Sequence, residues 1–395
     1  MKIEAQITDA GVGRVARGVL GVALVFGVIH AIVDAVCVAL LTRESGMAAS
    51  GSGEAALYLP GTTWWDLYLL YYAIAFCTQF SIGALVDRWG LYRAAALGSL
   101  GLLAAGVTVG HTAPAAAIVL VALGNAVFHV GAGALVLRLS PGRTSAAGVF
   151  VGPGAIGLAA GIWLQQEYAE FWPGISLALL AVSAVVSLAL GALSIATDCQ
   201  SERPASAESA PVPGRLAPRK HLVAVCLAAL LLSIALRSAT GLAVGQVHRS
   251  EIDELWGLAI AACAGKMLGG FAADRFGWIV TGVAILLLSM PLLSIFVDDG
   301  TSAVVGMALF QMTMPVTLMA VYRIFPREPG LAFGLASLAL LIGAVPSFLL
   351  PDVWPGIHLV LSVLLLLSVP ALVVGLLPLV RSRSAFSRRR HSPLP

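Results

Sequence analysis

Long apolar runs separated by short polar stretches cover almost the whole of this 395-residue chain. A helix needs roughly 20 predominantly apolar residues to cross the hydrocarbon core of a bilayer. Because runs of that length recur along the chain, the pattern predicts an all-α membrane protein with twelve transmembrane helices. The predicted spans are residues 17–42, 64–84, 91–110, 114–137, 145–165, 173–196, 221–246, 254–272, 277–297, 301–322, 329–350 and 356–380.

The longest internal polar segment, residues 197–220, lies between the sixth and seventh predicted spans and is rich in Pro, Ser and Ala. This composition is typical of a flexible linker. It divides the chain into an N-terminal six-helix half, residues 1–196, and a C-terminal six-helix half, residues 221–380. A basic tail, residues 381–395, follows the second half. We expect the two halves to be related by pseudo-symmetry.

The composition indicates a membrane protein. Hydrophobic residues make up 59% of the chain and charged residues 11%, whereas a soluble domain has about 25% charged residues. The cysteines show no metal-ligand or disulfide spacing, and the sequence has no phosphate-binding Walker loop. We therefore expect no metal, no cofactor and no enzymatic activity. Attraction to anionic lipid explains the basic tail, so we expect no nucleic-acid partner.

Basic residues gather in alternate loops between the predicted spans. With the N-terminus inside, 19 of the 23 Lys and Arg residues fall on the cytoplasmic side, as the positive-inside rule requires. We therefore predict a multi-pass protein of the cytoplasmic (inner) cell membrane, surrounded by the lipid bilayer, with both termini in the cytoplasm.

One polar motif, G-x-x-x-D-R-x-G, occurs once in each predicted half, after an even-numbered span. It consists of Gly83, Asp87, Arg88 and Gly90 in the first half and of Gly270, Asp274, Arg275 and Gly277 in the second. The two aspartates are 187 positions apart (274 − 87), nearly half the chain. The glycines permit close helix contact, the carboxylates can cap helix N-termini, and the arginines can pair with acidic neighbours. We therefore assign both motifs to conformational gating.

This repeated motif, in its place between apolar spans, resembles the hinge-loop signature of the major facilitator superfamily. The resemblance implies two pseudo-symmetric six-helix halves (the major facilitator fold) that work by alternating access. It also implies that the two turns stabilise the outward-open conformation. By analogy with most members of the superfamily, we expect a monomer.

Polar side chains inside the predicted spans are costly in hydrocarbon, so each is a candidate functional residue. His30 and Asp34 are four residues apart in the first span and therefore share a helix face. A carboxyl group poised between burial and a nearby cation can load and release a proton near neutral pH. We predict that this pair couples protons, with a hydrogen bond that only fixes helix packing as the alternative. Asn125 and His129 repeat the spacing in the fourth span and are candidates for binding substrate or a proton, with a packing hydrogen bond as the alternative.

Arg237 lies about as deep in the seventh span as Asp34 does in the first. In parallel repeats both positions would face a central cavity, and a guanidinium suits a carboxylate or a phosphate. We predict that Arg237 binds substrate and has Asp34 as its partner, with burial in a structural network as the alternative. Lys266 is interpreted as structural, because its stem can reach the cytoplasmic interface. Gln79 and Gln311 are further candidates for the cavity lining.

The fifth span is rich in glycine. Gly148 and Gly152 form one small-x-x-x-small ridge for close helix approach, Gly157 and Gly161 form another, and Pro153 can kink the span. The stretch resembles the glycine–proline motif of facilitator antiporters, which implies antiport. The glycine that this motif carries three residues after the proline lies four residues after it here, at Gly157.

Three short patterns stand in the first half: His30-x-x-x-Asp34, Gly124-x-x-x-Phe128-His129 and Gly142-Arg143. Together they are similar to the fosmidomycin-resistance branch of the superfamily. That branch exports small, often anionic compounds in exchange for protons, and the resemblance implies functional roles for His30, Asp34 and His129. The chain departs from the branch at Val130-Gly131, where Pro-Glu usually follows the Phe-His pair, so one membrane carboxylate is missing.

These observations predict a secondary active transporter that moves a small organic solute, such as an anion or a drug-like compound, across the cytoplasmic membrane. Proton-coupled export is the favoured direction, and the expected partners are the substrate, protons and lipid. Two alternatives stay open. One is proton-linked uptake of a small metabolite, and the other is a non-transporting receptor or assembly protein on the same scaffold.

Overall fold

The computed structural model describes residues 2–50, 64–198, 220–248, 252–349 and 356–390. These ranges are almost entirely helical, and no strand occurs within them. The helices are α1 (Lys2–Ser50), α2 (Trp64–Tyr72), η2 (Ala73–Cys77), α3 (Thr78–Trp89), α4 (Tyr92–Val109), α5 (Pro114–Leu139), α6 (Thr144–Val151), α7 (Gly154–Glu167), α8 (Trp172–Asp198), α9 (Lys220–Val247), α10 (Ile252–Phe276), α11 (Trp278–Ser294), α12 (Gly300–Gln311), α13 (Met314–Ile324), α14 (Pro329–Leu349) and α15 (Ile357–Arg390).

All twelve predicted spans are present as helices. Eleven are long and apolar enough to cross a membrane, and α11 is a shorter apolar helix of 17 residues. Three spans consist of consecutive helical segments, namely α2–η2–α3, α6–α7 and α12–α13. A proline lies at or next to two of these breaks, at Pro153 and Pro315, where the missing N–H interrupts the hydrogen-bond ladder.

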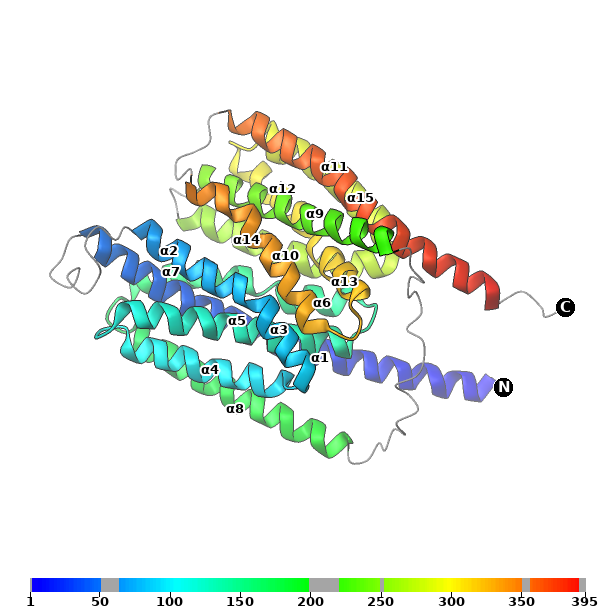
Figure 1. Ribbon diagram of the computed structural model, residues 1–395, viewed down its shortest axis with the longest axis horizontal. Coiled ribbons are helices and arrows are strands. Elements are labelled where there is room, and N and C mark those ends of the chain that lie inside the picture. The colour runs from blue at the N-terminus through cyan, green and yellow to red at the C-terminus, as the bar shows by residue number, and fades with distance from the viewer. Residues whose placement is uncertain (1, 51–63, 199–219, 249–251, 350–355, 391–395) are drawn as a thin grey trace.

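Helices α1–α8 and α9–α15 form two bundles that lie side by side (Figure 1). In the first bundle α4 packs on α5 and α1 packs on α7, and in the second α9 packs on α15 and α11 packs on α12. The two bundles contact each other mainly through α3 with α14 and through α6 with α10. Both ends of the chain leave the bundle at the same end of the molecule (Figure 1).

Two helices are longer than the spans predicted from apolarity. α1 extends on both sides of residues 17–42, and α15 continues through Arg390 into the predicted tail. Adding a residue to an existing helix costs far less than starting one, so a helix can outrun its apolar stretch. Residues 199–219 of the predicted linker and residues 391–395 of the predicted tail lie outside the described residues.

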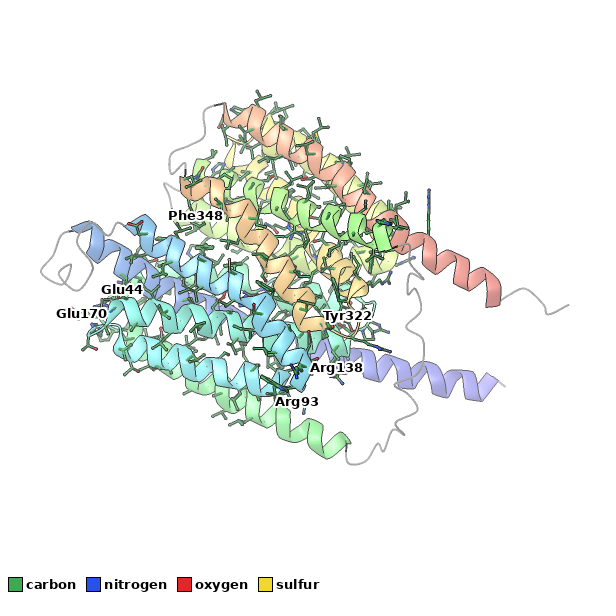
Figure 2. All side chains as sticks on the ribbon, viewed as in Figure 1. Glu44, Arg93, Arg138, Glu170, Tyr322 and Phe348 are labelled. Atoms are coloured by element: carbon green, nitrogen blue, oxygen red, sulfur yellow. The ribbon has the colours of Figure 1, made fainter. Side chains whose placement is uncertain are left out.

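Charged and apolar side chains are distributed as a membrane requires. Arg93 and Arg138 lie toward the end from which both termini leave, and Glu44 and Glu170 lie at the opposite end (Figure 2). Large apolar side chains such as Val185 and Leu359 are exposed along the helices, where a bilayer would cover them. The chain is a multi-pass membrane protein.

Candidate functional site

A cavity of about 220 Å³ lies between the two bundles. Its polar lining residues are His30, Asp34, Gln79, Asn125 and His129 from the first bundle and Arg237, Lys266, Thr317 and Ser337 from the second. Its aromatic lining residues are Tyr68, Tyr71, Tyr72, Phe76 and Phe333. A mostly apolar wall with a few convergent polar groups is the usual composition of a small-molecule site.

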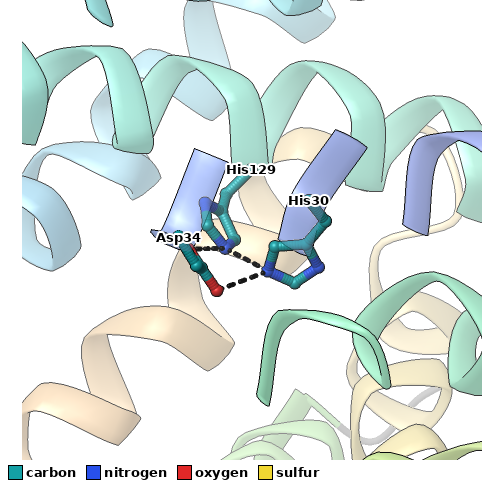
Figure 3. Close-up of side chains that lie close together, drawn as sticks. All are labelled: His30, Asp34 and His129. Carbon is teal, nitrogen blue, oxygen red and sulfur yellow. Dashed lines mark hydrogen bonds and ion pairs between the residues drawn. The ribbon is translucent and has the colours of Figure 1, made fainter. Parts of the chain in front are cut away.

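Asp34 is the centre of a polar network on the wall formed by the first bundle (Figure 3). One carboxylate oxygen, Oδ2, lies 3.1 Å from Nε2 of His30, and the other, Oδ1, accepts a hydrogen bond of 3.1 Å from Nδ2 of Asn125. Nε2 of His129 lies 2.8 Å from Nε2 of His30 and 3.8 Å from Oδ1 of Asp34. The structure thus joins the two pairs that were predicted in separate spans.

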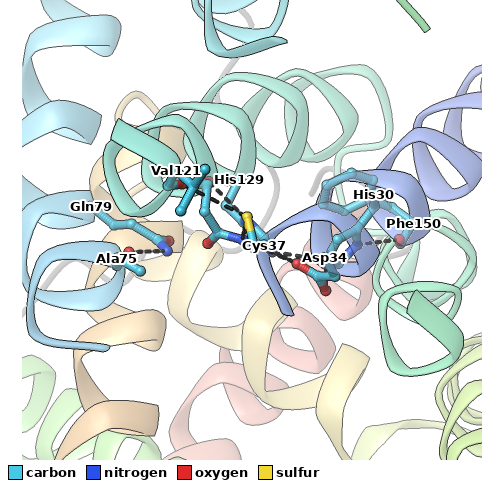
Figure 4. A network of polar contacts seen from close by, with 9 residues as sticks. His30, Asp34, Cys37, Ala75, Gln79, Val121, His129 and Phe150 are labelled. Atoms are coloured by element: carbon cyan, nitrogen blue, oxygen red, sulfur yellow. Dashed lines mark hydrogen bonds and ion pairs between the residues drawn. The ribbon is translucent and has the colours of Figure 1, made fainter. Parts of the chain in front are cut away.

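The helices hold both imidazole rings firmly in this network (Figure 4). Nδ1 of His30 lies 3.0 Å from the carbonyl oxygen of Phe150. The Phe150 ring also stacks on the His30 ring, with 5.1 Å between the ring centroids. Nδ1 of His129 lies 2.9 Å from the carbonyl oxygen of Asn125. Glycine at position 154 makes the room, because a Cβ there would lie 2.5 Å from Nε2 of His30.

The opposite wall, as far as the structure describes it, contributes two basic side chains, Arg237 and Lys266. Arg237 is buried, and its Nη1 donates a hydrogen bond of 2.8 Å to Oγ1 of Thr317. We expected Asp34 to be the partner of Arg237, and the structure differs because His30 and Asn125 hold that carboxylate. Lys266, which we interpreted as structural, lines the cavity instead of reaching away from it.

The two glutamine candidates lie in different surroundings. Gln79 lines the cavity, and its Nε2 donates to the carbonyl oxygen of Ala75 in the π-helical turn η2. Its buried Oε1 has no hydrogen-bond partner among the described residues. Gln311 is not among the residues that line this cavity, and its Nε2 lies 3.5 Å from Sδ of Met307.

Both G-x-x-x-D-R-x-G turns join one bundle to the other in the same way. The carboxylate of Asp87 accepts the N–H groups of Gly330 and Leu331, at 2.9 and 2.8 Å, where α14 begins. The carboxylate of Asp274 accepts the N–H groups of Thr144 and Ser145, at 2.7 and 3.0 Å, where α6 begins, and also accepts the Thr144 hydroxyl. A carboxylate at a helix N-terminus satisfies free N–H donors and the helix dipole.

The glycines of the two turns also correspond. Gly83 and Gly270 lie against backbone of the opposite bundle, where a Cβ would collide with Gly330 and Thr144 respectively. Gly90 and Gly277 have φ angles of 67° and 91°, which side chains rarely tolerate.

The arginines of the turns differ from expectation. Arg88 and Arg275 are exposed and have no acidic partner among the described side chains. The guanidinium carbon of Arg275 lies 5.7 Å from the centre of the Phe276 ring.

The chain superposes on transporters of known structure. No family model matches the chain, and no curated protein matches it in sequence. The structure of human MFSD10 (TETRAN), an organic anion transporter, superposes with a TM-score of 0.62 at 16% identity, over 91% of this chain and 99% of that one. A single-substitution variant of the Escherichia coli fucose:proton symporter FucP superposes with a TM-score of 0.54 at 14% identity, over 88% of this chain and 97% of that one. A second structure of the major facilitator superfamily transporter FucP, in the outward conformation, gives 0.51 at 13% identity, over 91% and 99%.

The chain has the major facilitator fold. The predicted fold class, twelve helices in two six-helix halves, is therefore confirmed. The resemblance to the fosmidomycin-resistance branch stays a prediction.

The glycine-rich span of this facilitator fold contacts a different partner at each end. A Cβ at Gly152 would lie 2.8 Å from Cγ of Met267, and Gly148 lies against backbone of Lys266, so α6 faces α10 of the other bundle. A Cβ at Gly157 would lie 2.9 Å from Cα of Ala31, so α7 faces α1 of its own bundle. Pro153 stands between the two segments.

None of the aromatic residues of the cavity wall was among the predicted site residues. Tyr68, Tyr71, Tyr72 and Phe76 line the cavity from α2 and η2. Tyr71, Tyr72 and Phe76 follow Tyr68 by three, four and eight residues, a spacing that places all four on one helix face. This signal was available in the sequence. Phe333 of α14 packs 6.2 Å from the rings of both His129 and Phe150, a contact that no local pattern indicates.

Proposed function

We propose that this protein is a secondary transporter that moves a small organic anion across the cytoplasmic membrane by alternating access. The observation that carries the proposal is the charge of the cavity between the two bundles. Arg237 and Lys266 line it, Asp34 is the one carboxylate that the described residues contribute to its lining, and His30 and Asn125 already hold that carboxylate. Positive charge in a buried, mostly apolar cavity selects an anion.

Alternating access is supported by the contacts between the bundles. Asp87 and Asp274 each cap a helix of the opposite bundle, so the two bundles can separate at this end only when both caps break. We propose residues 1–196 and 221–380 as the two moving halves, with residues 197–220 as the linker. We further propose that the end bearing the turns faces the cytoplasm, together with both termini, and that the protein works as a monomer.

The comparisons support transport of this kind. Two of the structures that share the fold are described as an organic anion transporter and a fucose:proton symporter. By analogy with the second, we propose that the transport is coupled to protons, with Asp34 and His30 as the coupling residues. Arg237, Asn125, His129 and Gln79 are the proposed substrate contacts.

The test is a transport assay in proteoliposomes that contain a trapped pH-sensitive dye. Gradients of small aromatic and aliphatic carboxylates and sulfonates are imposed, and empty liposomes report passive leakage. We expect anion-dependent proton movement in the wild type and none in Asp34→Asn. Arg237→Gln should lose transport of the anion itself.

A non-transporting receptor on the same scaffold gives a different result. In that case folded protein would bind an anion without moving it, and no gradient would produce flux. Transport of uncharged solutes alone, with Arg237→Gln as active as the wild type, would contradict the choice of an anion.

A further inference from the structure

The two histidines of the cavity face each other through the corresponding nitrogen of each ring, Nε2. Nδ1 of His30 faces the carbonyl oxygen of Phe150, and Nδ1 of His129 faces the carbonyl oxygen of Asn125. A carbonyl oxygen only accepts hydrogen bonds, so both Nδ1 atoms must carry hydrogen. In neutral rings both Nε2 atoms would then be unprotonated, with lone pairs.

These two Nε2 atoms are 2.8 Å apart. Two lone pairs that face each other at hydrogen-bond distance repel, so this arrangement requires a cation between them. Asp34, with Oδ2 at 3.1 Å from Nε2 of His30, supplies a counter-charge. The rings lie edge to face, at 88° between planes and 4.4 Å between centroids, so the nitrogens rather than the ring faces meet.

A proton fits this gap better than a metal ion does. The ligand atoms of His30, Asp34 and His129 are close enough together for a metal, but tetrahedral zinc at about 2.0 Å from two nitrogens separates them by about 3.3 Å. The observed 2.8 Å is an ordinary hydrogen-bond length. Lys266 and Arg237 also line the cavity, and their charges oppose a divalent cation more than a single proton.

We infer that His30 and His129 bind one proton between them, with Asp34 as counter-ion. The pair acts as a single proton site, so His129 belongs to the proton site and not only to the substrate contacts. The other titratable groups of the lining are Tyr68, Tyr71, Tyr72, Lys266 and Arg237, and Cys37 contacts Asn125 behind the network. None of them lies between the two Nε2 atoms.

The shared proton also predicts how proton binding and anion binding affect each other. This prediction rests on the proposed function. A proton on the pair adds positive charge to a cavity that binds an anion, so each should strengthen the binding of the other. A carrier that binds both together moves them in the same direction. The site therefore favours proton-linked uptake over the exchange that the branch resemblance implies.

The shared proton is tested without any substrate, by magic-angle-spinning NMR of ¹⁵N-histidine-labelled protein in lipid bilayers. The variant is His129→Gln, whose amide N–H can still donate to His30 but cannot bind a proton. His111→Gln, at an exposed ring that contacts Arg43 and not this network, is the matched control. We expect a scalar coupling between two Nε2 nuclei and uptake of one proton by the pair in the wild type and control, and neither in His129→Gln.

Two results would overturn the shared proton. One concerns the protonation of the rings. Either the two rings would titrate independently, each with its own Nε2 proton, or no Nε2 proton would be observed at any pH at which the protein stays folded. The other is evidence for a bound metal. The histidine ¹⁵N chemical shifts would then change on treatment with EDTA, or would shift to saturation with one equivalent of Zn²⁺.

The coupling is tested separately by calorimetric titration with benzenesulfonate, an aromatic anion that stays charged throughout, in buffers of different ionisation enthalpy. We expect proton uptake on binding and an affinity about tenfold weaker in His129→Gln, a typical size for coupled sites. Proton release on binding would overturn the mutual strengthening of proton and anion binding, but not the shared proton. The same holds if benzenesulfonate does not bind although the scalar coupling between the two Nε2 nuclei is observed. Absence of anion transport in proteoliposomes is a different failure, that of the proposed function.

Discussion

The two halves of this protein agree closely at their turns and disagree at the cavity. Asp87 and Asp274 cap helices of the opposite bundle with the same pair of backbone N–H bonds. Around each turn an arginine lies over an aromatic ring, Arg138 over Tyr92 at 5.4 Å and Arg323 over Trp278 at 3.8 Å. These pairs repeat at offsets of 185 (323 − 138) and 186 (278 − 92), close to the offset of the aspartates.

The cavity walls show no such correspondence. The first bundle supplies a connected network of His30, Asp34, Asn125 and His129, whereas the second supplies Arg237 and Lys266. The proposed function accounts for this difference. Both turns close the same end of the molecule, so the same contact serves twice, but a bound solute and a proton have no two-fold symmetry. The following changes test this division, from the largest expected effect to the smallest.

Removal of the guanidinium from the second wall should have the largest effect. Arg237→Gln is expected to lower kcat/KM for anion transport about 100-fold, because a charge-assisted contact of roughly 2.7 kcal/mol is lost. Initial rates in proteoliposomes measure it, with the exposed Arg93→Gln as the control. A rate equal to that of the wild type would remove the second wall from substrate binding.

Removal of the carboxylate from the first wall should uncouple the anion from the proton. With one proton per anion, a gradient of one pH unit supports about tenfold accumulation, and Asp34→Asn should lower this to about one. Exchange of labelled anion at equal concentrations should continue, because Arg237 is intact. Asp253→Asn, at an exposed helix start, is the control. Tenfold accumulation by Asp34→Asn would show that the first wall is not the coupling site.

Changes at the turns should be equal in the two halves. Asp87→Ala and Asp274→Ala each remove a helix cap worth about 1 kcal/mol, so each should lower the closed-to-open ratio at this end about fivefold. Energy transfer between probes on the ends of α3 and α14 measures the ratio. Arg88→Ala and Arg275→Ala should change it less, since neither arginine has an acidic partner among the described residues. A response from only one turn would break the correspondence between them.

The smallest effect is expected at Asp299, the N-cap of α12. Its carboxylate accepts the N–H of Ser302 at 2.8 Å, and the hydrogen bonds from Ser302 hold the pKa of Asp299 below its usual value. A lowered pKa in the folded state stabilises the protein above the unfolded pKa, and the benefit disappears as the pH falls through the folded pKa. Asp299→Ala should therefore lower Tm slightly at pH 7 and by less at pH 3. An equal Tm difference at both pH values would contradict the assignment to the ionised cap.

Most of the fold was predictable because each element needs only local information. A bilayer demands about 20 apolar residues per span, and those runs appear in the sequence one by one. The turn motif was recognisable because it occurs twice, and its last glycine because only glycine suits a positive φ, as at Gly90 and Gly277. The i, i+4 spacing also placed His30 beside Asp34, since 3.6 residues make one helical turn.

The sequence by itself thus determined the spans, the repeat, the turns and the short list of buried polar groups. Only the tertiary structure decided how those groups combine: His129 meets His30 across 99 positions, Arg237 meets Thr317 across 80, and Lys266 faces the cavity. The reason is physical. Burial of a polar group in an apolar span signals that it must have a partner, but periodicity within one helix carries no information about the helix that packs against it.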